Sequence, residues 1–166
     1  LGGNGDIVVL RGMPTTIDEQ RFDGFMSAIE GSGINVLDHQ YANWNRDDGF
    51  TVMQDFLSRF SKIDAVWAQD DDIAIGVIQA VRQARRQDEL FIVGGGGMKD
   101  IVRRVMDGDR LTPVDVLYPP SMISTAMELT ALRFISDTPI EGEYILGSPL
   151  IDQDNAEQYY FPESPF

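Results

Sequence analysis

The feature that most constrains this chain is a regular alternation of short apolar runs with segments whose apolar residues recur at helical spacing. Each helical pattern follows an apolar run, and the last extends from about Ser121 to Phe134. Strands buried on both faces and separated by helices indicate a parallel sheet covered on both sides. The expected fold class is therefore α/β, a three-layer αβα doubly wound parallel sheet. The runs that predict its strands are Ile7–Leu10, Ile34–Leu37, Ala65–Ala68, Leu90–Val93 and Val114–Leu117.

Composition excludes several classes of site. The 166 residues include no Cys and a single His, so disulfides, thiolate zinc sites and sites with two imidazoles are ruled out. The net charge of −14 disfavours nucleic acid as a partner, because an acidic surface repels phosphates. No apolar run approaches the length of a membrane span. The chain begins at Leu1 without an initiator Met, as expected of a processed product or an excised fragment.

The residues that follow each strand are the candidates for ligand binding. In doubly wound sheets, ligands bind beyond the carboxyl ends of the strands, near the point where the strand order reverses. The segments that fall there are 11–19, 39–45, 69–72, 94–98 and 118–121.

Two of these segments have both a structural and a ligand-binding interpretation. Residues 16–19 fit a capping box in which Thr16 accepts a hydrogen bond from the Glu19 amide. Alternatively, Glu19 or Arg21 points into the cleft. Trp44 lies among Asn residues, where it is either part of the core or a stacking surface for the apolar face of a sugar ring.

The remaining segments also leave alternatives open. One carboxylate of Asp70, Asp71 and Asp72 can cap a helix, while the other two are solvated or face a ligand. Three consecutive residues of a helix cannot all face one ion, so we expect no metal site. Residues 94–97 are four glycines that match no phosphate-binding motif, and they indicate a tight turn with open space beside it. Tyr118 is either packed or in contact with a ligand.

The sequence gives no indication of catalysis. No nucleophile has a plausible general base, and His39 is the single histidine. We therefore expect a protein that is not an enzyme and that uses no cofactor.

Several motifs together resemble a known family. The stretch from Trp67 to Gly76, WAQDDDIAIG, resembles the "(F/W)-A-x-N-D-x-x-A-x-G" stretch of type I periplasmic sugar-binding proteins and of the related LacI-type repressor cores. Residues 7–12 and 21–25 resemble their first strand and "R-x-x-G-F" helix, and residues 91–94 resemble their "V-V-G-F-D" strand. The turn at 107–109 resembles their "x-D-G-x" turn. The resemblance covers about residues 1–140.

The resemblance implies one lobe of a two-lobed fold with three crossovers between the lobes. Residues 1–118 would form the C-terminal ligand-binding lobe. Residues 119–166 would form a crossover, a helix and a tail that normally pack on an N-terminal lobe.

The resemblance also implies a set of ligand-binding residues. Three of them depart from the family pattern: Glu19 replaces a cation, Asp70 replaces Asn, and Gly96 replaces an Asp that accepts from ring hydroxyls. The space left at Gly96 is expected to admit a larger or differently substituted ligand. The full set carried over is Glu19, Trp44, Asp70, Gly96 and Tyr118.

The function implied is that of a periplasmic solute-binding component of an ABC transporter, with a sugar or polyol as ligand and the membrane permease as partner. The alternative is the effector-binding core of a LacI-type transcription regulator. An α/β enzyme or a flavodoxin-like module is a third possibility, disfavoured because no nucleophile–base pair or phosphate loop is found.

Residues 121–134 suggest how the chain behaves by itself. The helical pattern of this segment places an apolar stripe on Ile123, Ala126, Met127, Thr130 and Phe134. We expect self-association through this stripe. We also expect weak sugar binding by the chain alone, since the contacts of the other lobe and its closure are missing.

Overall fold

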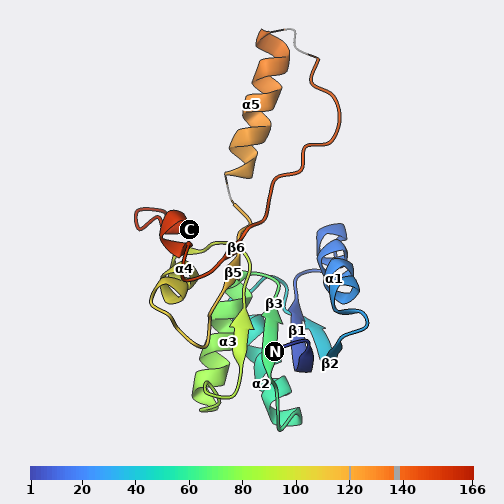
Figure 1. Ribbon diagram of the computed structural model, residues 1–166, viewed down its shortest axis with the longest axis vertical. Helices are drawn as coiled ribbons and strands as arrows, with labels where there is room; N and C mark the ends of the chain where they lie inside the picture. The colour runs from blue at the N-terminus through green and yellow to red at the C-terminus, as the bar shows by residue number, and fades with distance from the viewer. Residues whose placement is uncertain (120, 137–138) are drawn as a thin grey trace.

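The computed structural model describes residues 1–119, 121–136 and 139–166. Its centre is a parallel four-stranded sheet with the order β2-β1-β3-β4 (Figure 1). Parallel bridges from Val93 to Val114 and from Gly96 to Leu117 continue the sheet toward β5. The strands are β1 (Asn4–Arg11), β2 (Gly33–Tyr41), β3 (Ala65–Ala68), β4 (Phe91–Val93) and β5 (Asp115–Val116).

Helices cover both faces of this sheet. Alternate residues of β1 point to opposite faces, so Val8 and Leu10 enter the core formed with α2 and α3. On the other face, Phe25 of α1 packs on Trp67 of β3, with ring centroids 4.4 Å apart. The αβα doubly wound fold class is confirmed. The helices are α1 (Thr16–Ile29), α2 (Arg46–Arg59), α3 (Asp71–Gln83) and α4 (Lys99–Met106).

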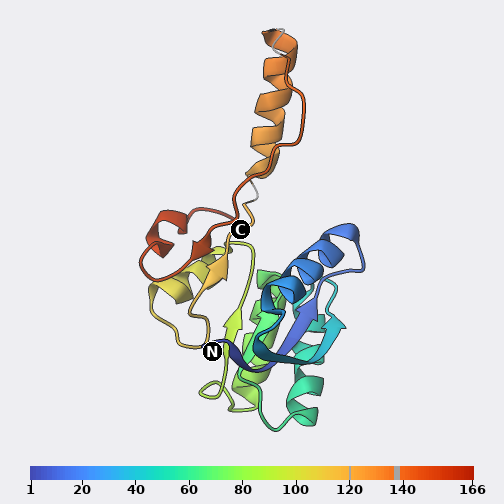
Figure 2. The same ribbon diagram turned by 45° about the vertical axis from the view of Figure 1, so that its right-hand side comes forward.

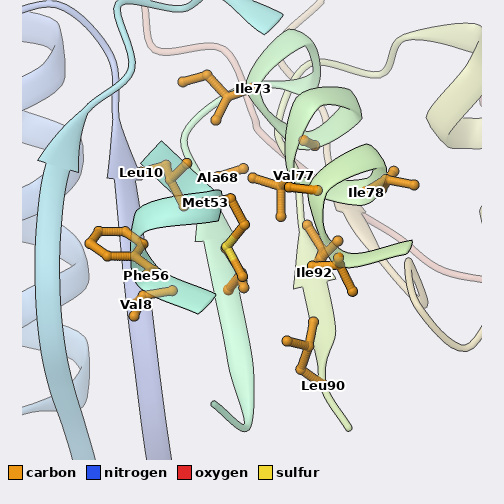
Figure 3. Packing of buried hydrophobic residues seen from close by; sticks show 14 of the residues in the cluster. Val8, Leu10, Met53, Phe56, Ala68, Ile73, Val77, Ile78, Leu90 and Ile92 are labelled. Atoms are coloured by element: carbon orange, nitrogen blue, oxygen red, sulfur yellow. The ribbon is translucent and has the colours of Figure 1, made fainter. Parts of the chain in front are cut away.

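The main core lies between the sheet and the α2–α3 pair (Figure 3). Phe56 and Met53 of α2 are fully buried beside Ile73 and Val77 of α3. The two helices approach closely because glycines stand at their crossing. A Cβ at Gly49 would lie 2.9 Å from the carbonyl oxygen of Ile73. This core fixes α3, and with it the residues at the amino-terminal end of α3.

Three of the helices begin with a side chain that accepts a hydrogen bond from a free backbone amide. Thr15 caps α1 by accepting from the Asp18 amide at 3.4 Å, so the expected capping box on Thr16 is wrong by one residue. Asn45 caps α2. Asp70 caps α3 by accepting from the Ile73 amide at 2.8 Å, as the acidic run predicted for one of its members.

Helix α5 (Met122–Ile135) stands away from the lobe, and residues 139–149 run back beside it (Figures 1 and 2). None of its residues is buried. Among the apolar side chains of α5, Phe134 is 79% exposed and Ile135 is 83% exposed. Pro120, Asp137 and Thr138 lie outside the described residues.

The end of the chain returns to the lobe. Strand β6 (Leu150–Ile151) pairs antiparallel with β5, and a 3₁₀ helix, η1 (Ala156–Tyr159), packs on α4. Ile151 and Ala156 are fully buried there beside Val102. The expected division has residues 119–166 packing on an N-terminal lobe. The structure differs for residues 150–160, because their apolar side chains complete the core around α4.

None of the described helices is long and apolar enough to cross a lipid bilayer.

Candidate functional site

The carboxyl ends of β1, β3, β4 and β5 meet at one edge of the sheet, and a pocket of about 300 Å³ lies there. Four of the five predicted ligand-binding residues line it, namely Trp44, Asp70, Gly96 and Tyr118. A second pocket of about 460 Å³ adjoins it, since Arg21, Gly95 and Tyr118 line both. The other residues of the first pocket are Ile17, Arg21, Asp71, Asp72, Gly95, Met98 and Phe166.

Trp44 combines the two interpretations that the sequence left open. Its indole packs against the main core and also lines the pocket. Trp44 and Asn43 both have left-handed backbones, with φ of 49° and 53°. The turn is held by the Asn43 amide, which donates to the Gly12 carbonyl oxygen at 3.2 Å. The indole lies so close to Gly12 that any Cβ there would overlap it.

Three carboxylates line the pocket, and Asp70 is the one that the sequence predicted as a ligand-binding residue. One of its oxygens caps α3, while burial raises its pKa to about 6, and the neighbouring Asp72 and Asp71 add to the effect. Asp72 is ion-paired with Arg46 at 2.8 Å. An ionised Asp70 can accept hydrogen bonds from ligand hydroxyls or from an ammonium group.

The cation beside Asp70 is Arg21. Its guanidinium donates to the carbonyl oxygen of Gln69 at 3.0 Å and lies 4.7 Å from the centre of the Tyr118 ring. Of the two candidates on α1, Arg21 therefore lines the pocket. The sequence interpretation named Arg21 only as an alternative to Glu19.

Glu19 lies outside the pocket lining. Its Oε1 forms an ion pair with Arg11 at 2.9 Å and accepts from the Tyr41 hydroxyl at 3.2 Å. The hydrogen bond from Arg11 holds the pKa of Glu19 below its usual range. Arg11 is itself buried against Asp18 and over the Phe22 ring, so this cluster joins α1 to the end of β1.

The space expected beside Gly96 is occupied. A Cβ there would lie 2.8 Å from Asp71 Oδ2 and 3.5 Å from the Phe166 ring. The expectation of spare volume at this position is therefore wrong. The glycine loop is also no phosphate cradle, because its amides at Gly95 and Met98 already donate to the carboxylate of Asp71.

Phe166 is the pocket residue that was not named from the sequence, whereas Asp71 and Met98 fall within the candidate segments 69–72 and 94–98. The acidic run named Asp71, but its burial follows from the packing of α3 on the loop after β4. Phe166 reaches the pocket because β6 and η1 return to the lobe. Residues 166 and 96 are far apart in the sequence, and no local pattern indicates their contact.

Comparison with known proteins shows the family of the chain. A family model described as a periplasmic binding protein domain matches residues 1–129. The chain belongs to the periplasmic binding protein family. The resemblance that the motifs indicated is thereby confirmed.

Two curated relatives and one solved structure show how this periplasmic binding protein lobe relates to others. It is 29% identical to the ribose import binding protein of Haemophilus influenzae over 144 residues, covering 86% of this chain and 48% of that protein. It is 32% identical to the xylitol-binding protein of Mycolicibacterium smegmatis, covering 95% of this chain and 45% of that protein. The chain therefore spans about half the length of the curated relatives it matches.

The solved structure is an ABC transporter periplasmic solute-binding protein from Actinobacillus succinogenes with bound D-allose. It superposes with a TM-score of 0.86 at 25% identity, covering 95% of this chain and 56% of that one. The periplasmic binding protein fold of the lobe is thus shared with a protein that holds a sugar.

Proposed function

We propose that this chain is the ligand-binding lobe of a periplasmic solute-binding protein that delivers a sugar or polyol to the membrane permease of an ABC transporter. The observation that carries the proposal is the pocket at the carboxyl edge of the sheet. It places an aromatic ring, Trp44, beside a carboxylate, Asp70, and a tyrosine, Tyr118. Apolar ring faces stack on indoles, and ring hydroxyls donate to carboxylates.

The relatives support a neutral, hydroxyl-rich ligand. The names of two of them refer to ribose and xylitol, and the solved structure holds D-allose. We infer that the ligand lies between this pocket and a second lobe, with α5 and residues 139–149 packed on that second lobe. Ligand binding then stabilises the closed arrangement, and the ligand leaves chemically unchanged.

The test uses the full-length protein and a panel of ribose, allose, xylitol and inositol, first by thermal shift and then by titration calorimetry. At least one compound is expected to raise the melting temperature. Trp44→Ala is expected to lower its affinity about fivefold or more and Asp70→Ala about tenfold or more, since aromatic contacts contribute about 1 kcal/mol and hydrogen bonds to charged groups about 1.5–3 kcal/mol. Asp47→Asn, at an exposed site on α2, is the matched control.

The pH dependence of binding adds a signature of Asp70. Burial raises the pKa of Asp70 to about 6, and a ligand hydroxyl that donates to this carboxylate favours its ionised form. Affinity is therefore expected to be highest above pH 6 and to fall as the pH is lowered through 6. Asp70→Asn keeps a side chain that can cap α3 and is expected to remove this dependence.

The proposal fails if no sugar or polyol of the panel stabilises the protein, or if the ligand is converted to a product. A helix-turn-helix encoded upstream of this lobe would favour a transcription regulator, whereas a signal peptide there would support the periplasmic assignment.

A further inference from the structure

Two acidic side chains that take no part in the proposed ligand contacts are buried together at the glycine loop, Asp71 on the wall of the pocket and Asp115 on β5. Asp71, in the first turn of α3, is 2% exposed, and Asp115 of β5 is fully buried. Among the residues that the structure describes, no lysine or arginine forms an ion pair with either carboxylate. Isolated buried charges are costly, so the pair needs another source of compensation.

Part of that compensation comes from the backbone of the glycine loop, residues 94–98. Asp71 accepts hydrogen bonds from the amides of Gly95 at 3.0 Å and Met98 at 2.7 Å. Asp115 accepts from the amide of Gly97 at 3.0 Å. The two carboxylates thereby hold three backbone amides of this loop.

The fit between loop and carboxylates also explains the glycines. A Cβ at Gly94 would overlap Asp71 Oδ1 and lie 3.1 Å from Asp115 Oδ1. A Cβ at Gly96 would lie 2.8 Å from Asp71 Oδ2. The carboxylates occupy the space that side chains would need, so the loop wraps closely around them.

One oxygen of the pair lacks an ordinary donor. Asp115 Oδ1 is buried and accepts from no backbone amide or other donor group of the described chain. It lies near Asp71, since a Cβ at Gly94 would meet an oxygen of each carboxylate. Two neighbouring carboxylates can form a hydrogen bond only when one of them carries a proton, because an ionised carboxylate has no donor.

We propose that Asp71 and Asp115 hold one proton between them at neutral pH, and that this shared proton positions the glycine loop on the wall of the pocket. Burial, and then the charge of Asp71, raises the pKa of Asp115 to about 8, and burial also raises that of Asp71. Asp71 and Asp115 are positioning residues, since their hydrogen bonds hold the amides of the loop.

The charged groups around the pair do not replace the proton. On α3, Asp70 and Asp72 flank Asp71 with the same sign of charge. On α4, the ammonium of Lys99 donates to the carbonyl oxygen of Ser164 at 2.7 Å. The guanidinium of Arg21 is bound to the carbonyl oxygen of Gln69. The strand residues of β4 and β6, 91–93 and 150–151, carry no ionisable side chain.

Loss of the shared proton has a direct consequence for the loop. Above about pH 8 two buried negative charges face each other, and their repulsion separates Asp71 from Asp115. Because Asp71 holds Gly95 and Met98 while Asp115 holds Gly97, separation of the carboxylates pulls the loop amides in different directions.

Nuclear magnetic resonance of the full chain tests the proposal without any ligand, so its failure is distinguishable from failure of the proposed function. In the wild type, the carboxyl carbon of Asp115 is expected to titrate near pH 8. The amide signals of Gly95, Gly97 and Met98 are expected to shift with the same midpoint.

Asp115→Asn is the decisive variant, because its amide can donate permanently to Asp71 and accept from Gly97. The step near pH 8 is expected to disappear from the Gly95 and Met98 amides while the loop signals stay dispersed. Asp72→Asn is the control: it removes an acid from the same helix that is ion-paired with Arg46, and the step is expected to remain.

Either of two results overturns the proposal. The first is the absence of a step in the wild-type loop amides between pH 6.5 and 9, and the second is its persistence in Asp115→Asn. If Asp115→Asn does not fold, the wild-type carboxyl titrations decide, and midpoints below pH 5 for both Asp71 and Asp115 refute a shared proton.

Discussion

At the scale of single residues, the position of Trp44 depends on a glycine at the end of another strand. The indole lies directly on Gly12, whose amide is held by Asp18 at 2.9 Å and by Gln69 at 3.2 Å. With both partners fixed, the backbone at Gly12 cannot move aside for a side chain. Any side chain at this position must therefore displace the indole.

Gly12→Ala is accordingly expected to weaken ligand binding by the full-length protein several-fold or more, because overpacking of a filled site costs about 1–3 kcal/mol. Titration calorimetry with the compound identified in the panel measures the loss. In the Trp44→Ala background, Gly12→Ala is expected to have little further effect. An equal loss in both backgrounds would show that Gly12 acts independently of Trp44.

The residues of the pocket were predictable to the extent that strand ends identify them. Trp44, Asp70, Gly96 and Tyr118 all follow strands, and the topology of a parallel sheet brings them to one edge. The roles of Asp71 and Asp115 could not be predicted in this way. Their burial arises from the packing of α3, β5 and the glycine loop, and an acidic residue in sequence carries no mark of its burial.

At the scale of the elements, the crossing of α2 and α3 depends on backbone contact. A Cβ at Gly76 would overlap the carbonyl oxygen of Arg46 and lie 2.7 Å from the amide nitrogen of Phe50. Both of these atoms belong to the backbone of α2, so they can move only if the whole helix moves. The spacing of α2 and α3 is therefore set at Gly76.

Gly76→Ala is expected to lower the free energy of unfolding by about 1–3 kcal/mol, although alanine is the better helix former by about 1 kcal/mol. Gly24→Ala is the matched control, because Gly24 is within α1 and has no atom within 4 Å of the added methyl group. It is expected to stabilise the protein by about 0.5–1 kcal/mol. Urea unfolding measures both, and a stabilising Gly76→Ala would contradict the crossing described here.

The elements of the sheet were predictable from their periodicity, and those at the chain end were not. Each strand from β1 to β5 has an apolar run, and each helix from α1 to α5 has apolar residues at helical spacing. By contrast, β6 has two residues and η1 has four, too few for any period to be recognised. Their place is decided by burial of Ile151 and Ala156 on α4, which is a tertiary effect.

At the scale of the whole molecule, the exposed apolar side chains of α5 determine how the chain behaves by itself. Ile123 is 62% exposed and Met127 is 67% exposed, on the same helix as Phe134. Contiguous exposed apolar surface of this kind promotes association. The chain alone is therefore expected to form concentration-dependent dimers or larger species in analytical ultracentrifugation.

Replacing Ile123, Met127 and Phe134 by serine is expected to restore the monomer. Met26→Ser is the control, since Met26 is an exposed apolar residue that lies on α1 and not on α5. A strict monomer at high concentration in the unmodified chain would refute association through α5.

The two connections between the lobe and α5 have a mechanical consequence. The outgoing chain at Leu117 donates to the carbonyl oxygen of Pro149 in the returning chain at 3.0 Å, and β5 pairs with β6 just below. The hydrogen bond and the strand pairing hold the outgoing and returning chains side by side where they leave the lobe. A pull or twist applied to α5 therefore enters the lobe through β5, the strand whose Asp115 supports the wall of the pocket.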